Sequence, residues 1–180
     1  AVSGDGVRTV LVRQTDIAGN ESTSSLSFTL DTTVAAPGVG LLSDTGSSTS
    51  DRLTKSSALN VTGVESGAKV EYSVDGGNTW SSSFSAIEGL NTVQVRQTDV
   101  AGNVSSASTF TFTLDTTAAS APTVGLSLDT GSSTTDKITK LGSLSVMGVE
   151  SGAKVEYSTD NGATWKTTFS AAEGLNTVLV

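Results

Sequence analysis

The 180-residue sequence contains no cysteine and no histidine, and it has only two prolines and one methionine. The absence of cysteine excludes a disulfide scaffold and a thiolate metal site, and without histidine the usual nucleophile–base pairs of covalent catalysis are excluded as well. No apolar run approaches the roughly 20 residues that span a bilayer, and no charged-then-apolar signal segment opens the sequence. The sequence therefore predicts a protein that is not an enzyme and does not insert into a membrane.

Acidic residues outnumber basic ones by 18 to 10, which gives a formal net charge of −8. Such a charge argues against a nucleic-acid partner or an anionic membrane surface, and it favours cations. A small domain without disulfides must gain its additional stability from packing, from neighbouring repeats or from a metal ion. The acidic composition makes a bound cation the first of these to consider.

The sequence repeats itself. Val12–Thr33 reads VRQTDIAGNESTSSLSFTLDTT, and Val95–Thr117 has the same text with one additional residue. Further along the chain Trp80 recurs as Trp165, 85 positions later. A repeat of roughly 84 residues has the usual size of a single domain. The sequence predicts three pieces: the last part of a first repeat (1–33), a complete repeat (34–117) and the first part of a third (118–180).

Apolar and polar residues alternate along Thr92–Thr98 and along Thr109–Leu114, which is the period of a strand with one buried face. The Asp-Val-Ala-Gly-Asn segment between them has the composition of a turn, so the two strands form a hairpin. Residues 9–30 repeat this pattern. No segment has a helical period of useful length, and six or seven short strands are expected in each repeat. The sequence predicts an all-β protein of tandem β-sandwich domains.

Two shorter motifs have a structural interpretation. The connectors Asp31–Pro37 and Asp115–Pro122 end in proline, which predicts a stiff joint. Residues 73–80 and 158–165 resemble the Asp-box of sialidase propellers, but those enzymes have repeats of about 50 residues and a cluster of arginines. We interpret the box as a turn, and we expect its tryptophan and the preceding Tyr72 to be core residues rather than a platform for sugar.

Acidic residues recur at positions that the alternation of strand direction brings together. At one end of the complete repeat Asp31, Glu65, Asp99 and Asn103 should converge, and the Asp44–Asp51 loop should meet Asp115 at the other. Carboxylate, amide and backbone oxygens are the ligands that Ca²⁺ prefers. The alternative is that these residues are helical caps, Asx turns and solvated loop acids.

The sequence also resembles a known family. The motifs Thr-Asp-x-Ala-Gly-Asn, Leu-Asp-Thr-Thr-x-Ala, Asp-Thr-Gly-Ser-Ser-x-x-Asp and Gly-Val-Glu-Ser-Gly-Ala-Lys-Val-Glu-Tyr-Ser are similar to those of the extender region of giant bacterial adhesins. These type I-secreted RTX and biofilm-associated proteins are built of tandem bacterial immunoglobulin-like domains. The resemblance covers nearly all of the chain. It implies Ca²⁺ at the joints between domains, export from a Gram-negative cell to its surface, and a spacer that holds a distal adhesive domain.

The resemblance carries over a set of candidate metal ligands: Asp31, Asp44, Asp51, Asp99, Asn103, Asp115, Asp129 and Asp136, with Asp16 and Asn20 as counterparts of Asp99 and Asn103. The expected partners are neighbouring repeats of the same polypeptide, and the sequence does not indicate which receptor is bound. Two alternatives stay open: an adhesive module that binds carbohydrate or protein, and a repeat that associates with itself. For the latter, residues 1–33 are too few for a core and residues 118–180 lack the hairpin that 1–33 resemble. The two ends could therefore complement one another head to tail between molecules.

Overall fold

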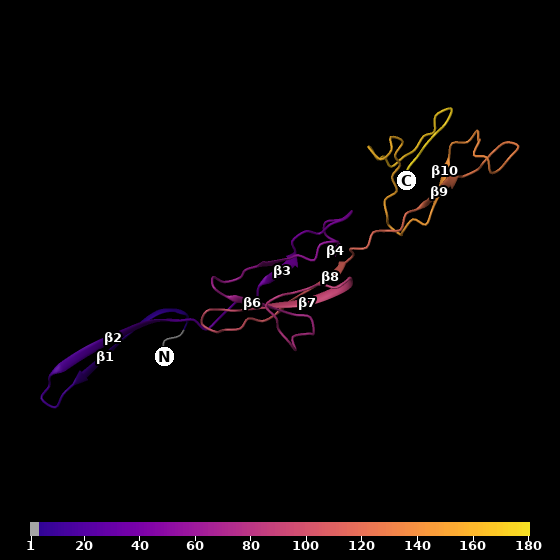
Figure 1. The fold of residues 1–180 in the computed structure, drawn as a ribbon. Coiled ribbons are helices and arrows are strands. Elements are labelled where there is room, and N and C mark those ends of the chain that lie inside the picture. The colour runs from indigo at the N-terminus through magenta and orange to yellow at the C-terminus, as the bar shows by residue number, and fades with distance from the viewer. Residues whose placement is uncertain (1–3) are drawn as a thin grey trace. The chain divides into compact units, whose positions relative to one another are not determined.

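The computed structural model describes residues 4–180, and every regular element in this range is a β-strand (Figure 1). Contacts divide the chain into one unit that extends to Thr116 and a second unit, Thr117–Val180. The ten strands are β1 (Gly6–Thr15), β2 (Glu21–Leu30), β3 (Gly38–Leu41), β4 (Leu53–Thr54), β5 (Leu59–Thr62), β6 (Lys69–Ser73), β7 (Gly89–Thr98), β8 (Ser108–Leu114), β9 (Thr123–Leu126) and β10 (Leu144–Met147). Across residues 4–180, no helix has the length and apolar character needed to cross a membrane.

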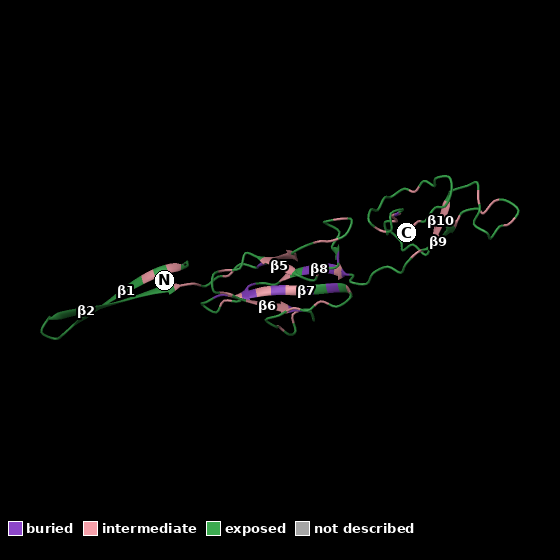
Figure 2. Ribbon diagram, turned by 45° about the horizontal axis from the view of Figure 1, so that its top comes forward, coloured by how far each residue is buried: buried purple, intermediate pink, exposed green. Residues whose placement is uncertain are grey.

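Strands β1 and β2 form a two-stranded antiparallel hairpin, here called the amino-terminal hairpin, in register from Gly6 opposite Leu30 to Thr15 opposite Glu21. The turn closes because the Asp16 carboxylate accepts hydrogen bonds from the backbone N–H and the side-chain amide of Asn20, both at 2.8 Å. Gly19 has a φ of 86°, a left-handed conformation that glycine adopts without steric cost. Most residues of this hairpin are exposed, as the colouring of Figure 2 shows. Its apolar side chains are among the exposed ones.

Residues 38–114 form the middle domain, a sandwich of two sheets. Strands β3 and β5 pair antiparallel, and the other sheet has the order β4-β8-β7-β6. The core consists of residues on β7 and β8, and apolar residues of β3, β5 and β6 pack against it. Figure 2 shows the buried positions along β7 and β8. The predicted all-β sandwich is confirmed, and the buried hydrophobic residues of its core are Val93, Val95, Phe110, Phe112 and Leu114.

Strand β4 corrects one expectation from the sequence. The sequence indicates no strand directly after the Asp44–Asp51 loop, but in the structure β4 lies between this loop and β5. This two-residue strand pairs in parallel with the end of β8, and the backbone N–H of Asp115 donates to the carbonyl of Thr54 at 2.9 Å. A strand of two residues is too short to show an alternating pattern, so only its distant partner defines it.

The second unit repeats the local structure of the middle domain. Strands β9 and β10 pair in the register of β3 and β5, with Leu126 opposite Leu144. Lys137 has a φ of 61°, and its counterpart Arg52 has a φ of 63°. Tyr157 is bridged to Lys166 as Tyr72 is bridged to Ser81 in the middle domain. At these positions equal local sequence produces equal local conformation, whereas residues 154–158, the counterpart of β6, form only isolated bridges.

Candidate metal centre

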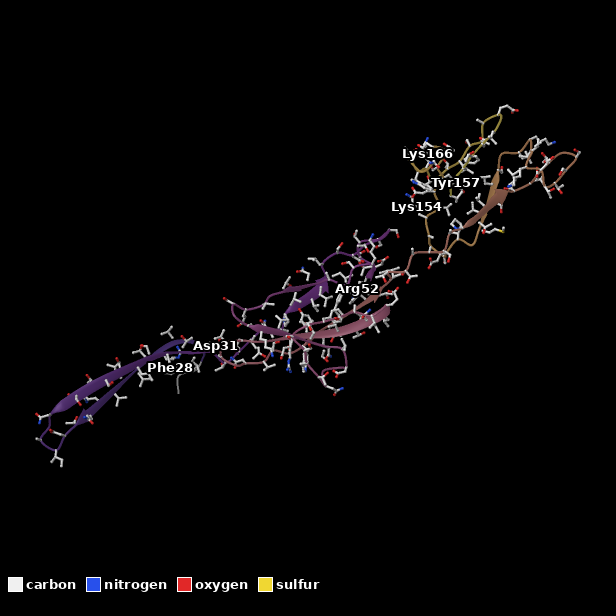
Figure 3. The ribbon with its side chains drawn as sticks, viewed as in Figure 1. Phe28, Asp31, Arg52, Lys154, Tyr157 and Lys166 are labelled. Carbon is white, nitrogen blue, oxygen red and sulfur yellow. The ribbon has the colours of Figure 1, made fainter. Side chains whose placement is uncertain are left out.

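Three carboxylates converge where the chain passes from the amino-terminal hairpin to the middle domain. One oxygen each of Asp31, Glu65 and Asp99 lies within 4.8 Å of the others. Asp31 directly follows β2 (Figure 3), Glu65 belongs to the turn before β6, and Asp99 follows β7. Asp99 is buried and the other two are partly buried. The expected convergence of these side chains is therefore observed, and we call the three residues the acidic cluster.

Asn103 holds the most buried member of the acidic cluster in place. The Asp99 carboxylate accepts hydrogen bonds from the side-chain amide and the backbone N–H of Asn103, both at 2.8 Å. These bonds, the side-chain one first, hold the pKa of Asp99 below its usual value although burial opposes them. The same side-chain amide donates to the backbone carbonyl of Asp31 at 3.1 Å. Asn103 thus orients two members of the cluster through its N–H groups.

Gln97 binds the connector to the domain. Its side chain is fully buried, and its amide nitrogen donates to the carbonyls of Ala35 (2.8 Å) and Gly63 (3.0 Å). Its oxygen accepts from the backbone N–H of Glu65 at 2.9 Å, so it also positions a member of the acidic cluster. Sequence reasoning missed this residue. The signal was present, because Gln97 is a polar residue at the inward position that Val93 and Val95 occupy earlier in β7.

Two further contacts hold the end of the connector. The Ser108 hydroxyl donates to the carbonyl of Pro37 at 2.6 Å, and Pro37 is fully buried. Gly38 lies so close to β5 that a Cβ at this position would be 2.5 Å from the hydroxyl of Thr62. A side chain at Gly38 would therefore force the connector away from the domain. The prediction of a stiff joint gains support from these contacts.

Most of the other candidate ligands lie in loops and accept hydrogen bonds from backbone N–H groups of the same loop. Asp44 accepts a hydrogen bond from the backbone N–H of Arg52 at 2.9 Å, and Asp51 from that of Leu53 at 3.0 Å. Their counterparts Asp129 and Asp136 accept equivalent bonds. Asp16 and Asn20 form the turn of the exposed hairpin. Across residues 4–180 only the acidic cluster brings three carboxylates this close together, so Asp44, Asp51, Asp115, Asp129 and Asp136 stay predictions as ligands.

Asp44 and Asp129 share one further property. In each, the second carboxylate oxygen is buried and accepts no hydrogen bond from residues 4–180. A buried carboxylate oxygen without a donor is costly unless water or a cation satisfies it. Both repeats have this buried carboxylate oxygen at the equivalent position. We therefore attribute it to the loop sequence that they share.

The Asp-box is a turn, as predicted. Asp75 accepts hydrogen bonds from the hydroxyl of Thr79 (2.6 Å), its backbone N–H (2.9 Å) and the hydroxyl of Ser73 (2.7 Å), which together lower its pKa. In the second unit, equivalent bonds led by the Thr164 hydroxyl lower the pKa of Asp160 to about 2. The Ser, Asp and Thr side chains of the box thus stabilise the turn.

The prediction that Trp80 is a core residue is wrong. Tyr72 does pack against the core, but Trp80 is only partly buried and lies against Arg96, whose guanidinium carbon is 4.0 Å from the ring centroid. A cation at this distance over an indole ring is a favourable contact. The Trp80 ring therefore packs against the charged side chain of Arg96, which lies on β7.

Residues 33–116 match the family model of the bacterial Ig-like domain. Together with the two-sheet sandwich, this match shows an Ig-like repeat. Such domains are typically non-enzymatic structural domains, and they are typical of extracellular or surface proteins. No curated protein matches the chain. The matched segment contains Glu65 and Asp99, and Asp31 lies two residues before it, so the acidic cluster lies at the boundary of the Ig-like domain.

Proposed function

We propose that this chain is a spacer segment of a bacterial cell-surface adhesin, in which Ca²⁺ stiffens the joints between Ig-like domains and a distal domain makes the adhesive contact. The observation that carries the proposal is the acidic cluster at the start of the connector. Its members come from the strand before the connector and from two loops of the following domain. A cation held there would fasten one repeat to the next.

The donor set fits Ca²⁺. Asp31, Glu65 and Asp99 would hold the ion, each with a carboxylate oxygen that lies within 4.8 Å of the others. Carboxylates are the hard oxygen ligands that Ca²⁺ takes, and backbone carbonyls and water would complete its six to eight. Three carboxylates within 4.8 Å repel one another, and a bound Ca²⁺ supplies the opposite charge. Asn103 and Gln97 would keep the carboxylates oriented without binding the ion.

The geometry suits a spacer. Strand β7 has ten residues, which at about 3.3 Å per residue is roughly 33 Å, so many tandem repeats make a long segment. Because an ion that binds only the native joint stabilises it by mass action, Ca²⁺ outside the cell would order the joints. Inside a Gram-negative cell, where free Ca²⁺ is scarce, the joints would stay looser, which suits export by type I secretion.

The test is thermal unfolding of the 180-residue chain in Ca²⁺, in Mg²⁺ and in excess chelator. A ligand at a hundred times its Kd stabilises by about 2.7 kcal/mol, and each kcal/mol shifts the Tm of a domain of this size by roughly 4–8 °C. We expect a rise of roughly 10 °C or more in Ca²⁺, lost in Asp99→Asn. Asp16→Asn, the same change in the exposed hairpin, is the matched control. An equal Tm in Ca²⁺ and chelator would reject the cation.

One observation supports a second candidate, a carbohydrate-binding adhesive module. Trp165 is 46% exposed on the second unit, and exposed indole rings stack on sugars. Its counterpart Trp80 is covered by Arg96, so the ring is exposed in one repeat and covered in the other. This candidate ranks second. It predicts that a panel of soluble glycans quenches or shifts Trp165 fluorescence in a Trp80→Phe background, and no response to any of them would remove it.

A further inference from the structure

Strand β5 of the middle domain has one unpaired edge. In the β3–β5 sheet the backbone N–H of Leu42 donates to the carbonyl of Ala58 at 2.8 Å. Hydrogen bonds between antiparallel strands involve every second pair of residues, so β5 bonds to β3 through Ala58 and Asn60. The backbone N–H and C=O groups of Leu59 and Val61 therefore point to the other edge of β5, where no strand within residues 4–180 pairs with it.

A groove, here called the β5 groove, runs beside this unpaired edge. It has a volume of about 720 Å³ and is lined by residues 55–59 and by residues 82–84. Tyr72 and Phe84 supply its aromatic surface, with ring centroids 6.3 Å apart. Ligand sites in proteins typically have volumes of about 300–1,000 Å³, so the β5 groove is large enough for a ligand.

The β5 groove stays open because the segment on its far side is bound to the other sheet. Residues 82–86 belong to no strand. Just before them, Ser81 exchanges two backbone hydrogen bonds with Tyr72 of β6, at 2.8 and 2.9 Å. Just after them, the backbone of Ile87 exchanges two with the side chain of Asn91 on β7, at 2.9 and 2.7 Å. Strands β6 and β7 belong to the four-stranded sheet, so these bonds keep the segment from pairing with β5.

The same groove recurs in the second unit. It has a volume of about 560 Å³ and is lined by residues that include Leu144 of β10 and 167–171. The hydrogen bonds between β9 and β10 alternate as those between β3 and β5 do, so the backbone groups of Leu144 and Val146 point to the unpaired edge of β10. The segment on its far side is likewise held through the bridge between Tyr157 and Lys166. The sequence that the two repeats share therefore specifies the groove.

The unpaired edge complements an extended peptide. Leu59 and Val61 together offer two N–H donors and two C=O acceptors at the spacing of a strand, which is what an added strand needs. The side chain that an added strand places opposite Leu59 points inward, as the Leu59 side chain does, and meets Tyr72 and Phe84. An apolar side chain suits this position. A saccharide lacks the alternating N–H and C=O groups that match such an edge.

The charge of the β5 groove favours an acidic peptide. Its lining includes Lys55 and the hydroxyl side chains of Thr45, Ser56, Ser57, Ser82 and Ser83, and it contains no acidic residue. This is notable in a chain with 18 acidic residues. Neither Lys55 nor its counterpart Lys140 forms an ion pair with any of residues 4–180. A carboxylate of the peptide would supply the opposite charge.

We propose that the β5 groove binds an extended acidic peptide of a partner protein as an added strand. The peptide bonds to the backbone of Leu59 and Val61, places an apolar side chain against Tyr72 and Phe84, and places a carboxylate near Lys55. The groove needs no cation, and none of its lining residues belongs to the acidic cluster, so the inference goes beyond the proposed function. Because the groove recurs, one chain can bind such a partner at more than one repeat.

The first test is amide hydrogen exchange of the 180-residue chain, resolved by NMR and recorded in excess chelator. In the free chain the N–H groups of Leu59 and Val61 should exchange fast, whereas that of Asn60 should be protected by its bond to β3. Protection of Leu59 and Val61 in the free chain would overturn the proposal, since the edge would then be closed by the domain itself or by a second copy.

The probe is a blocked heptapeptide with aspartate at both ends and valine alternating with threonine between them. It should protect Leu59 and Val61 from exchange. Two variants are N-methylated, one at its valines and the other at its threonines. An added strand turns alternate N–H groups towards β5, so one variant should bind at least about tenfold more weakly and the other as the parent does. Equal binding of the two variants would overturn the proposal.

Lys55→Glu tests the charge of the site. It should weaken the binding of the probe severalfold when binding is followed at Leu59 and Val61, because the pairing with the peptide's carboxylate becomes a repulsion. Binding followed at Leu144 and Val146 should not change, so the second unit is the control within the same molecule. Unchanged binding at Leu59 and Val61 would overturn the proposal of an acidic peptide. A soluble glycan that protects these two residues as the probe does would overturn the proposal of an added strand.

Discussion

Two hairpins of this molecule share a sequence and a register but differ in burial. In β7–β8 the inward residues form the core of the middle domain, and in β1–β2 the same residue types are exposed. Both hairpins have the same turn, in which an aspartate accepts two hydrogen bonds from an asparagine four residues on. The comparison shows that strand pairing and turn geometry are local properties, whereas burial depends on the strands that the rest of the domain supplies.

The difference is clearest at the glutamines. Gln97 is fully buried and joins β7 to the connector and to a turn, whereas Gln14 is exposed. The same residue type stabilises a joint in one hairpin and contacts solvent in the other. Paired substitutions at equivalent positions of the two hairpins can therefore separate what the local sequence contributes from what the domain contributes.

The largest expected effect is at the core aromatic. Phe112→Ala should lower the free energy of unfolding of the middle domain by about 3–5 kcal/mol because it leaves a cavity in a packed core. Phe28→Ala should leave it unchanged, since Phe28 contributes nothing to that core. The measurement is urea unfolding followed by Trp80 fluorescence in a Trp165→Phe background, at concentrations where the chain is monomeric. Equal effects at both positions would contradict the difference in exposure, which is 1% for Phe112 and 44% for Phe28.

The next largest loss of stability is expected for substitution of the buried Gln97. Gln97→Ala should cost about 2 kcal/mol, because it leaves the backbone N–H of Glu65 and the carbonyls of Ala35 and Gly63 without their partner. Gln14→Ala should cost nothing measurable by the same unfolding assay. If the Gln97 variant is as stable as the parent, the connector is held by other contacts.

A smaller effect is expected at the asparagine of the turn. Asn103→Ala should cost about 1 kcal/mol, since a typical side-chain hydrogen bond is worth that much, and it should speed amide hydrogen exchange along the connector. Asn20→Ala should speed exchange only in its own turn. Exchange in the connector that is unchanged in Asn103→Ala would show that the bond to Asp31 does not order it.

The smallest expected effect is on the pH dependence of thermal stability. It concerns the Asp-box aspartate, which makes equivalent hydrogen bonds in the two repeats. The pKa of Asp160 in the folded state is about 2, below the value of 3.8 for an unperturbed side chain, and that of Asp75 is lowered likewise. A lowered pKa stabilises the fold at pH above the unfolded value, and this stabilisation is lost as pH falls from about 4 towards 2. Asp160→Asn should therefore flatten the acid side of the thermal stability profile, and Asp75→Asn should do the same. A steeper profile in either variant would contradict the sign.

The sequence predicted what depends on neighbours along the chain. The hairpins, their turns and the Asp-box turn follow from alternation and from residues that bond to their own backbone, so each was found in place. The convergence of Asp31, Glu65 and Asp99 also followed, because antiparallel connectivity decides which loops share an end of a sandwich. These predictions used the order of strands and needed no knowledge of packing.

What the sequence could not predict depends on distant partners. Strand β4 exists because two residues meet the end of β8, which lies about 60 positions further along the chain. The place of Trp80 is decided by Arg96 on β7, which lies over its ring, and the local sequence of the Asp-box does not indicate that contact. Gln97 was overlooked because a glutamine within a strand usually faces solvent, and only the carbonyls of Ala35 and Gly63 make its burial favourable.

The fastening of the connector has a mechanical consequence. The chain meets the middle domain beside Ser108 and leaves it after Leu114, so its two attachment points lie at opposite ends of β8. Tension applied along the chain therefore acts along β8 and loads the hydrogen bonds to β7 and β4 in shear, all at once, rather than peeling them apart one by one. Resistance to forced unfolding is set by the rate of crossing that barrier. Such an arrangement lets a small domain bear load with its sheet rather than with a disulfide.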